Sequence, residues 1–283
     1  MKLPFKIDLN NKVAVVTGGT GVLCAELAAA LAASGAKVAV LGRNAEAAEK
    51  TAARLRDFGG PAIGISANVL ERPTLEAAAE RVLNELGPCD LLINGAGGND
   101  PKGTTSKEWF EQGDLEQDSL TTFFDLDPRG IEAVLNLNFL GTLLPTQVFA
   151  RQMLGRSGCS IINISSMNAL RPLTKIPAYS GAKAAVSNFT QWLAVHFAKA
   201  GIRVNAIAPG FFLSEQNRKL LIDEAGSFTA RAQKIVGHTP MGRFGESHEL
   251  IGTLLWLASE EGSGFVNGVV VPVDGAFSAY AGV

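Results

Sequence analysis

Tyr179 and Lys183 are spaced so that they could share one proton-transfer site. They stand four residues apart in a stretch, residues 177–200, whose pattern predicts a helix, and residues at that spacing lie on one helical face. A Lys ammonium stabilises a nearby phenolate, and lowering a Tyr pKa from about 10 toward 7 requires roughly 4 kcal/mol of such stabilisation. A phenol tuned in this way can protonate a carbonyl oxygen as hydride arrives, or take the proton in the reverse direction. On its own the pair is weak evidence, because ordinary surface pairs have the same spacing.

Two further polar residues are expected at the same place. Ser166 directly follows a predicted strand, residues 160–165, and its hydroxyl can donate to the same carbonyl oxygen. Asn138 lies in the helix predicted before that strand and could hold a water that relays protons to Lys183. Open α/β sheets place their sites at the carboxyl ends of the strands. The sequence therefore predicts a catalytic group of Asn138, Ser166, Tyr179 and Lys183.

The elements that must position these residues alternate along the chain. Short apolar runs predict strands at residues 13–17, 37–41, 61–67, 90–94, 160–165, 203–208 and 269–273. Helical spacing predicts helices at residues 22–33, 45–58, 74–86, 130–154, 177–200 and 246–259. This alternation is typical of βαβ units. It predicts one α/β domain over residues 1–283, a Rossmann-type doubly wound parallel sheet of about seven strands with helices on both faces.

Two excursions interrupt the alternation, at residues 98–130 and 211–240. The first carries eight acidic residues, three basic residues and four aromatic side chains. It is long for a connection between a strand and a helix, so it is either a functional wall or an oligomer contact.

A glycine-rich turn joins the first predicted strand to the first predicted helix. Residues 17–23 read Thr-Gly-Gly-Thr-Gly-Val-Leu. In a doubly wound sheet this position binds the pyrophosphate of a dinucleotide through backbone N–H groups and the helix N-terminus. The alternative is a glycine-rich junction with no ligand. The predicted cofactor contacts here are Gly18, Gly19, Thr20, Gly21, Val22 and Leu23.

The end of the second predicted strand bears on which cofactor is bound. A free ribose 2′-OH usually meets an Asp or Glu there, but this strand runs into Gly42, Arg43 and Asn44, with no carboxylate before Glu46. Arg suits a 2′-phosphate through bidentate contacts. The alternative is that Arg43 only caps the sheet edge. We therefore expect NADP(H) to be favoured, with NAD(H) still open.

The overall composition excludes several classes of protein. The chain has 283 residues, 47% hydrophobic, with a net charge of -2, which argues against a disordered or a nucleic-acid-binding protein. Cys24, Cys89 and Cys159 form no CxxC pair, so neither a metal site nor a disulfide framework is expected. Residues 1–12 contain no apolar leader, and no uncharged apolar run reaches 18 residues. We expect a cytoplasmic protein with no membrane contact.

The ordered residues Thr17 and Gly18, 94–97 (Asn-Gly-Ala-Gly), Asn138, Ser166, Tyr179, Lys183, Pro209 and Gly210 resemble the short-chain dehydrogenase/reductase family over essentially the whole chain. The resemblance implies that Tyr179 is the acid/base, that Lys183 binds the nicotinamide ribose and tunes Tyr179, that Ser166 orients the carbonyl, and that Asn138 holds a relay water. The cofactor contacts that it adds are Arg43, Asn44, Asn68, Val69, Asn94, Gly95, Ala96, Tyr179, Lys183, Pro209, Gly210 and Phe212. The chain departs from the family at Val22 and Cys24, where the family's motif has glycines, and at Asn68, where Asp is usual.

Residues 165–174, 208–217 and 271–283 look like the subgroup named D-mannonate oxidoreductase, or fructuronate reductase. A sugar acid needs a cation for its carboxylate and hydrogen-bonding groups for its hydroxyls. The predicted substrate contacts are Asn168, Arg171, Gln216 and Asn217, the last two in the excursion that forms a lid in this family. The alternatives are another short-chain activity, such as gluconate 5-dehydrogenase or 3-oxoacyl reductase, or a non-catalytic NADP-binding regulator. The family also implies a homotetramer.

Overall fold

The chain forms a seven-stranded parallel sheet in the order β3-β2-β1-β4-β5-β6-β7. The computed structural model describes residues 7–213, 218–224 and 226–282. The strands are β1 (Val13–Thr17), β2 (Lys37–Gly42), β3 (Ala62–Ser66), β4 (Leu91–Asn94), β5 (Cys159–Ile164), β6 (Ile202–Pro209) and β7 (Val270–Val273). The order reverses direction at β1 and β4, and the predicted Rossmann-type sheet is confirmed. Ligands bind at such a reversal, beside the carboxyl ends of the strands.

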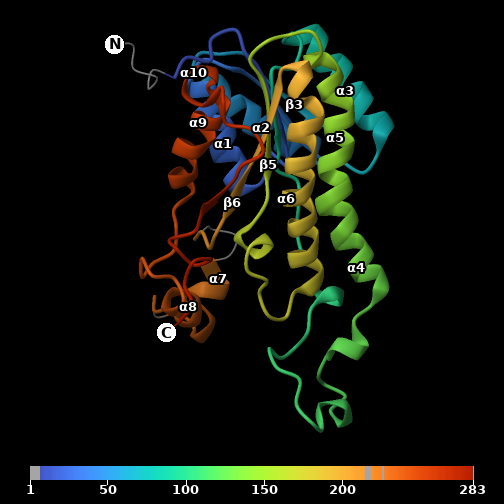
Figure 1. Ribbon diagram of the computed structural model, residues 1–283, viewed down its shortest axis with the longest axis vertical. Coiled ribbons are helices and arrows are strands. Elements are labelled where there is room, and N and C mark those ends of the chain that lie inside the picture. Colours follow the sequence, from blue (N-terminus) through green and yellow to red (C-terminus); the bar gives the residue numbers. More distant parts are fainter. Residues whose placement is uncertain (1–6, 214–217, 225, 283) are drawn as a thin grey trace.

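The helices form two layers on the sheet (Figure 1). One layer contains α1 (Val22–Ala33), α2 (Ala45–Arg56) and α9 (Ile251–Ala258), and the other contains α3 (Arg72–Glu85), α4 (Pro128–Leu135), α5 (Gly141–Phe149) and α6 (Pro177–Phe197). The remaining helices are α7 (Arg218–Leu221), α8 (Ala230–Gly237) and α10 (Glu260–Ser263). Each layer closes its own apolar core. Leu27, Leu31 and Leu254 pack on one face of the sheet, and Leu75 and Phe149 pack on the other.

The helix predicted over residues 130–154 is interrupted in the structure. Between α4 and α5 the chain forms a π-helical segment, Asn136–Leu140, and after α5 a 3-10 turn, Ala150–Met153. Wide turns of this kind are often found at functional sites, and this one contains Asn138. The run Pro128–Met153 is long and apolar enough to cross a membrane by length and composition, but half of its apolar window is buried within the protein. It packs against α3 and α6 as a core helix.

The two predicted excursions lie outside the sheet. Residues 98–130 contain three 3-10 turns, Pro101–Gly103, Asp114–Glu116 and Phe123–Asp125, and extend beyond the sheet at the foot of Figure 1. The described part of residues 211–240 contains α7 and α8. We call these the insert (98–130) and the lid segment (211–240).

Candidate active site

Strand β5 and helix α6 bring Ser166, Tyr179 and Lys183 together at the carboxyl edge of the sheet. Ser166 lies two residues beyond β5, and its hydroxyl accepts a hydrogen bond from the N–H of Asn168 at 3.2 Å. Pro177 occupies the first turn of α6, where its missing N–H costs nothing. Tyr179 and Lys183 follow on adjacent turns, and the Ser166 hydroxyl hydrogen-bonds to the Tyr179 phenol. The neighbouring Ser165 bonds to Ser187 at 2.7 Å and is part of the packing.

Lys183 is a buried cation with a lowered pKa. Its ammonium donates to the carbonyl of Ile164 at 2.8 Å and lies 5.6 Å from the centre of the Tyr179 ring. Because burial disfavours the charged form, the pKa of Lys183 falls from 10.5 to about 8. Burial also raises the pKa of Tyr179, and only the bond to Ser166 opposes that rise. The predicted fall of the Tyr179 pKa toward 7 is therefore wrong for this structure, because desolvation by burial is the largest cause and raises the pKa. The phenol stays protonated at neutral pH.

Asn138 anchors the chain that leaves β4. Its side-chain amide donates to the carbonyls of Gly98 (2.7 Å) and Val134 (2.8 Å), and its side-chain oxygen accepts the Gly98 N–H at 3.3 Å. A Cβ on Gly97 would lie 2.6 Å from that oxygen and 3.1 Å from the Lys183 ammonium. The Asn138 oxygen and Lys183 thus meet across Gly97. Sequence reasoning included Gly97 in the motif 94–97, but it did not anticipate the contacts of Gly97 and Gly98 with Asn138.

The turn after β1 has the shape of a phosphate cradle. Gly18 has a φ of +63° and lies so near the main chain of Ala96 that a Cβ would approach within 2.9 Å. Gly21 ends the turn, and the first helical bond of α1 runs from Ala25 N to Gly21 O. The N–H groups of Val22, Leu23 and Cys24, in the first turn of α1, therefore remain for an anion, whereas those of Gly19 and Gly21 donate to Leu41 and Gly18. Glycines and a free helix N-terminus fit the pyrophosphate of a dinucleotide. The residues placed here are Gly18, Gly19, Thr20, Gly21, Val22 and Leu23.

Cys24 shows how the departure from the family's glycine motif is accommodated. Its thiol lies 3.7 Å from the Gly95 carbonyl oxygen, and a Cβ on Gly95 would be 2.2 Å from the sulfur. The larger side chain on α1 therefore fills space that a glycine after β4 leaves free. Burial raises the pKa of the Cys24 thiol to about 11, so it behaves as an inert packing group. No feature of the sequence pattern predicted this reciprocal exchange.

The predicted nucleoside contacts differ in how free their side chains are. Arg43 is exposed and follows Gly42, whose Cβ would lie 2.8 Å from the Thr20 methyl group. Asn44 caps α2 by accepting the Ala47 N–H at 2.9 Å, so its side chain has a structural task. Asn68 likewise closes a turn, since its side chain contacts Glu71 and the Leu70 N–H. Val69 is buried against Gly141.

The Asn94 side chain is buried below the site; among the described residues its amide nitrogen is paired, while its oxygen has no hydrogen-bond partner. Its side-chain amide donates to Thr146 and to its cross-strand partner Asn163, both at 2.9 Å. Gly95 and Ala96 turn their N–H groups toward Thr17 Oγ1, at 3.1 and 3.4 Å. Any cofactor contact of Asn94 would therefore be made by its main chain.

The predicted substrate residues do not all converge. Asn168 is buried behind Ser166. Arg171 is exposed and donates to the main-chain oxygen of Tyr280 at 2.9 Å, so it holds the C-terminal tail rather than standing free for a carboxylate. Gln216 and Asn217 lie outside the described residues. Pro209 ends β6, and Gly210 lies so close to Asp274 that a Cβ would approach within 2.6 Å.

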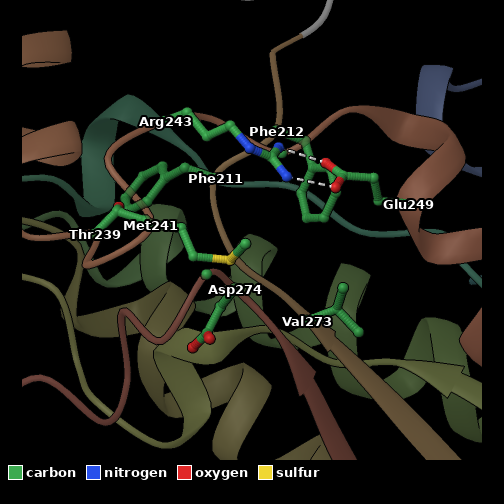
Figure 2. A pocket seen from close by; sticks show the side chains of 10 residues that line it. Phe211, Phe212, Thr239, Met241, Arg243, Glu249, Val273 and Asp274 are labelled. Carbon is green, nitrogen blue, oxygen red and sulfur yellow. Dashed lines mark hydrogen bonds and ion pairs between the residues drawn. The ribbon is translucent and has the colours of Figure 1, made fainter.

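Phe212 belongs to a recess between the lid segment and β7 (Figure 2). Arg243 and Glu249 form two bonds of 2.7 Å beside the buried Phe212 ring, so Arg243 is a structural cation. The recess has a volume of about 90 Å³, and its lining includes none of the four predicted catalytic residues. The lining residues are Phe211, Phe212, Thr239, Met241, Arg243, Gly245, Glu249, Val273, Asp274 and Gly275. Across the part of the chain that the structure describes, no three metal-ligating side chains gather.

Comparison with known proteins agrees with this geometry. Residues 12–225 match the family model described as short chain dehydrogenase. An uncharacterized oxidoreductase of Haemophilus influenzae is 59% identical over all of this chain and 99% of its own length. A Haemophilus crystal structure with bound NAD, provisionally named a D-mannonate oxidoreductase, is 58% identical over the whole of both chains, with a TM-score of 0.94.

A gluconate 5-dehydrogenase from Burkholderia cenocepacia, solved with NADP and tartrate, is more distant. It is 30% identical over 98% of this chain and 99% of its own, with a TM-score of 0.83. Both the family match and the length of these alignments cover the glycine turn, Ser166, Tyr179 and Lys183. The chain belongs to the short-chain dehydrogenase/reductase family and is an NAD(P)-dependent oxidoreductase acting on CH–OH groups.

Proposed function

We propose that this enzyme interconverts a keto sugar acid and the corresponding hydroxy acid, with D-fructuronate and D-mannonate as the pair. The observation that carries the proposal is the group formed by the buried Ser166 and Lys183 and the half-buried Tyr179 near the phosphate cradle. A polar small molecule is the expected partner. The Haemophilus relative's provisional name and the tartrate bound by the Burkholderia relative support a hydroxy acid.

In the proposed reaction each residue has one task. A bound nicotinamide cofactor supplies or accepts the hydride at the substrate carbon. Ser166 donates a hydrogen bond to the carbonyl oxygen and holds it beside Tyr179, and Tyr179 gives that oxygen its proton during reduction. Because burial keeps the pKa of Tyr179 high, the phenol carries the proton that reduction consumes. Lys183 holds the ribose hydroxyls, and the Asn138 oxygen holds the water through which a proton returns.

We propose that NADP(H) is preferred and that NAD(H) is also used. The exposed Arg43 beside Gly42 offers a guanidinium for a 2′-phosphate, and the first carboxylate after it is Glu46. Replacing Arg43 with Glu should lower kcat/KM for NADPH by about ten-fold or more while leaving NADH turnover nearly unchanged. An equal fall with both cofactors would reject this role for Arg43.

The function is tested by following NADPH and NADH oxidation with keto-sugar acids, neutral keto-sugars and oxoacyl thioesters. We expect turnover of the sugar acids. Preference for a gluconate-type 5-keto acid or for an oxoacyl thioester would instead favour a gluconate 5-dehydrogenase or a 3-oxoacyl reductase. Tight NADPH binding with no oxidation across the panel would favour a non-catalytic regulator.

We further propose that residues 1–283 form one domain, that the enzyme is cytoplasmic and that it assembles as a homotetramer. Exposed apolar side chains on α6 support assembly, since Trp192 is 56% and Val195 80% exposed. Trp192 also stacks between Phe189 and His196. Light scattering of wild type and Trp192→Glu should show a tetramer and a smaller species, and a monomeric wild type would reject the assembly.

A further inference from the structure

The insert and the lid segment are in contact through an ion pair. Glu108 of the insert forms an ion pair with Lys234 of α8, although 126 residues separate them. The Nδ1–H of His238, directly after α8, donates to the main-chain oxygen of Lys234 at 2.8 Å. An ion pair between two side chains thereby joins the insert to the lid segment.

The base of the insert is fixed to the loop that leads into Tyr179. The Thr105 N–H donates to the Lys175 carbonyl at 2.9 Å. A Cβ on Gly103 would lie 3.6 Å from the Cβ of Ala178, the residue before Tyr179. The insert therefore packs against the start of α6 at its base and reaches α8 through Glu108.

The charges around Glu108 favour this contact. Lys234, Lys175 and His238 each lower the pKa of the Glu108 carboxyl, with the bond to Lys234 the largest cause. Four other acidic groups of the insert have partners within it: Glu111 and Asp114 both pair with Lys107, Asp125 bonds to Thr122 and Asp127 pairs with Arg129. Among the ion pairs of the described residues, the one between Glu108 and Lys234 joins the insert to the lid segment.

We propose that Glu108 and Lys234 are a positioning pair that sets the distance between the two walls of the substrate space. This inference rests on the proposed function, since it takes the insert and the lid segment to enclose the substrate. The ion pair keeps the insert and the lid segment at a fixed separation. Its loss should therefore weaken substrate binding, seen as a higher KM, more than it slows the chemical step, seen in kcat. The side chains of Glu108 and Lys234 are 24% and 56% exposed, so the coupling is of the modest size typical of exposed ion pairs.

A double-mutant cycle with Glu108→Gln, Lys234→Gln and both together tests the pair. For the keto acid that the wild type turns over, we expect each single variant to raise KM about two- to five-fold with little change in kcat. The double variant should be no worse than either single one. Glu111→Gln is the matched control, because its partner Lys107 lies within the insert. Additive effects, or an unchanged KM in both single variants, would overturn the proposal.

Hydrogen exchange without substrate separates this inference from the proposed function. Each single variant should speed amide exchange in both residues 107–114 and 230–237, whereas Glu111→Gln should affect the insert alone. If the wild type reduces keto acids and exchange in these segments is unchanged in the variants, the positioning pair is rejected and the function stands. If each single variant speeds exchange in both segments but the wild type reduces no keto acid, the positioning pair stands and the function is rejected.

Discussion

The catalytic edge and the two walls beside it are built in opposite ways. Asn138, Lys183 and Ser166 are 0%, 4% and 8% exposed and bond to main-chain groups of Gly98, Ile164 and Asn168 respectively. In the insert, Trp109, Phe123 and Phe124 are 73%, 67% and 68% exposed. The insert is held by short turns and surface ion pairs. From this difference we expect the reaction to depend on the core and substrate selection to depend on surface segments that can change without disturbing the core.

The largest effect is expected from a substitution confined to the catalytic edge. Tyr179→Phe removes the proton donor without removing a core ring, so kcat should fall by about 10³-fold while cofactor binding changes little. Steady-state rates and NADPH fluorescence titration measure the two quantities. A variant that retains wild-type kcat would show that another group transfers the proton.

Lys183→Met should abolish turnover and raise the free energy of unfolding. The pKa of Lys183 is lowered in the folded protein to about 8, so the unfolded chain binds more protons between about pH 8 and 10.5. The cost of burying the charge is therefore fully present below pH 8 and disappears as the pH rises toward 10.5.

At pH 7 we expect Lys183→Met to be about 2 kcal/mol more stable than wild type, after about 1 kcal/mol for the lost bond to Ile164. Urea unfolding at pH 7 and at pH 9.5 measures the gap, which should shrink at the higher pH, and turnover should be lost at both. A gap that does not change with pH would contradict the lowered pKa.

Gly95→Ala tests how tightly the cofactor side of the edge is packed. The new Cβ would lie 2.2 Å from the Cys24 sulfur and 2.9 Å from the Thr17 carbonyl oxygen, so we expect a loss of about 1–3 kcal/mol. Adding Cys24→Ala should recover part of that loss. Gly98→Ala is the control, because its Cβ would meet only Leu137 at an ordinary 3.5 Å. Equal costs at Gly95 and Gly98 would show that the sulfur contact does not constrain the turn.

The smallest effect is expected at Arg171, which lies between β5 and α6 and outside both walls. Because Arg171 donates to the Tyr280 main chain, Arg171→Ala should raise KM for a keto acid by less than about ten-fold. If Arg171 were instead the buried partner of a substrate carboxylate, its loss would cost about 2–5 kcal/mol of binding free energy and would raise KM by about 30-fold or more. Arg129→Ala, at a surface pair with Asp127, serves as the control. An increase in KM above 100-fold would restore Arg171 as the carboxylate ligand.

The regular elements could be predicted from sequence because each has its own periodic signal. Strand β1 and helix α1 have the predicted bounds, and Tyr179 and Lys183 share the predicted face of α6. The π-helical turn at Asn138 has the same apolar spacing as an ordinary helix, so the pattern did not show it. The pKa of Tyr179 was predicted in the wrong direction, because burial depends on the whole fold and not on one neighbour.

Contacts between distant segments had no signal in the sequence. The partner of Arg171 is a main-chain oxygen 109 residues away, and a backbone carbonyl leaves no trace in residue type. Glu108 and Lys234 each resemble ordinary surface charges until the fold places them together.

The central claim, that a keto sugar acid is the substrate, is tested most directly by one pair of rates. D-Fructuronate and D-fructose share a carbon skeleton and differ in having a carboxylate or a hydroxymethyl group at one end. We expect kcat/KM for NADPH-dependent reduction to be about 100-fold or more higher for D-fructuronate, the size of one well-placed charged contact. Equal values for the two sugars, or faster reduction of D-fructose, would contradict the account.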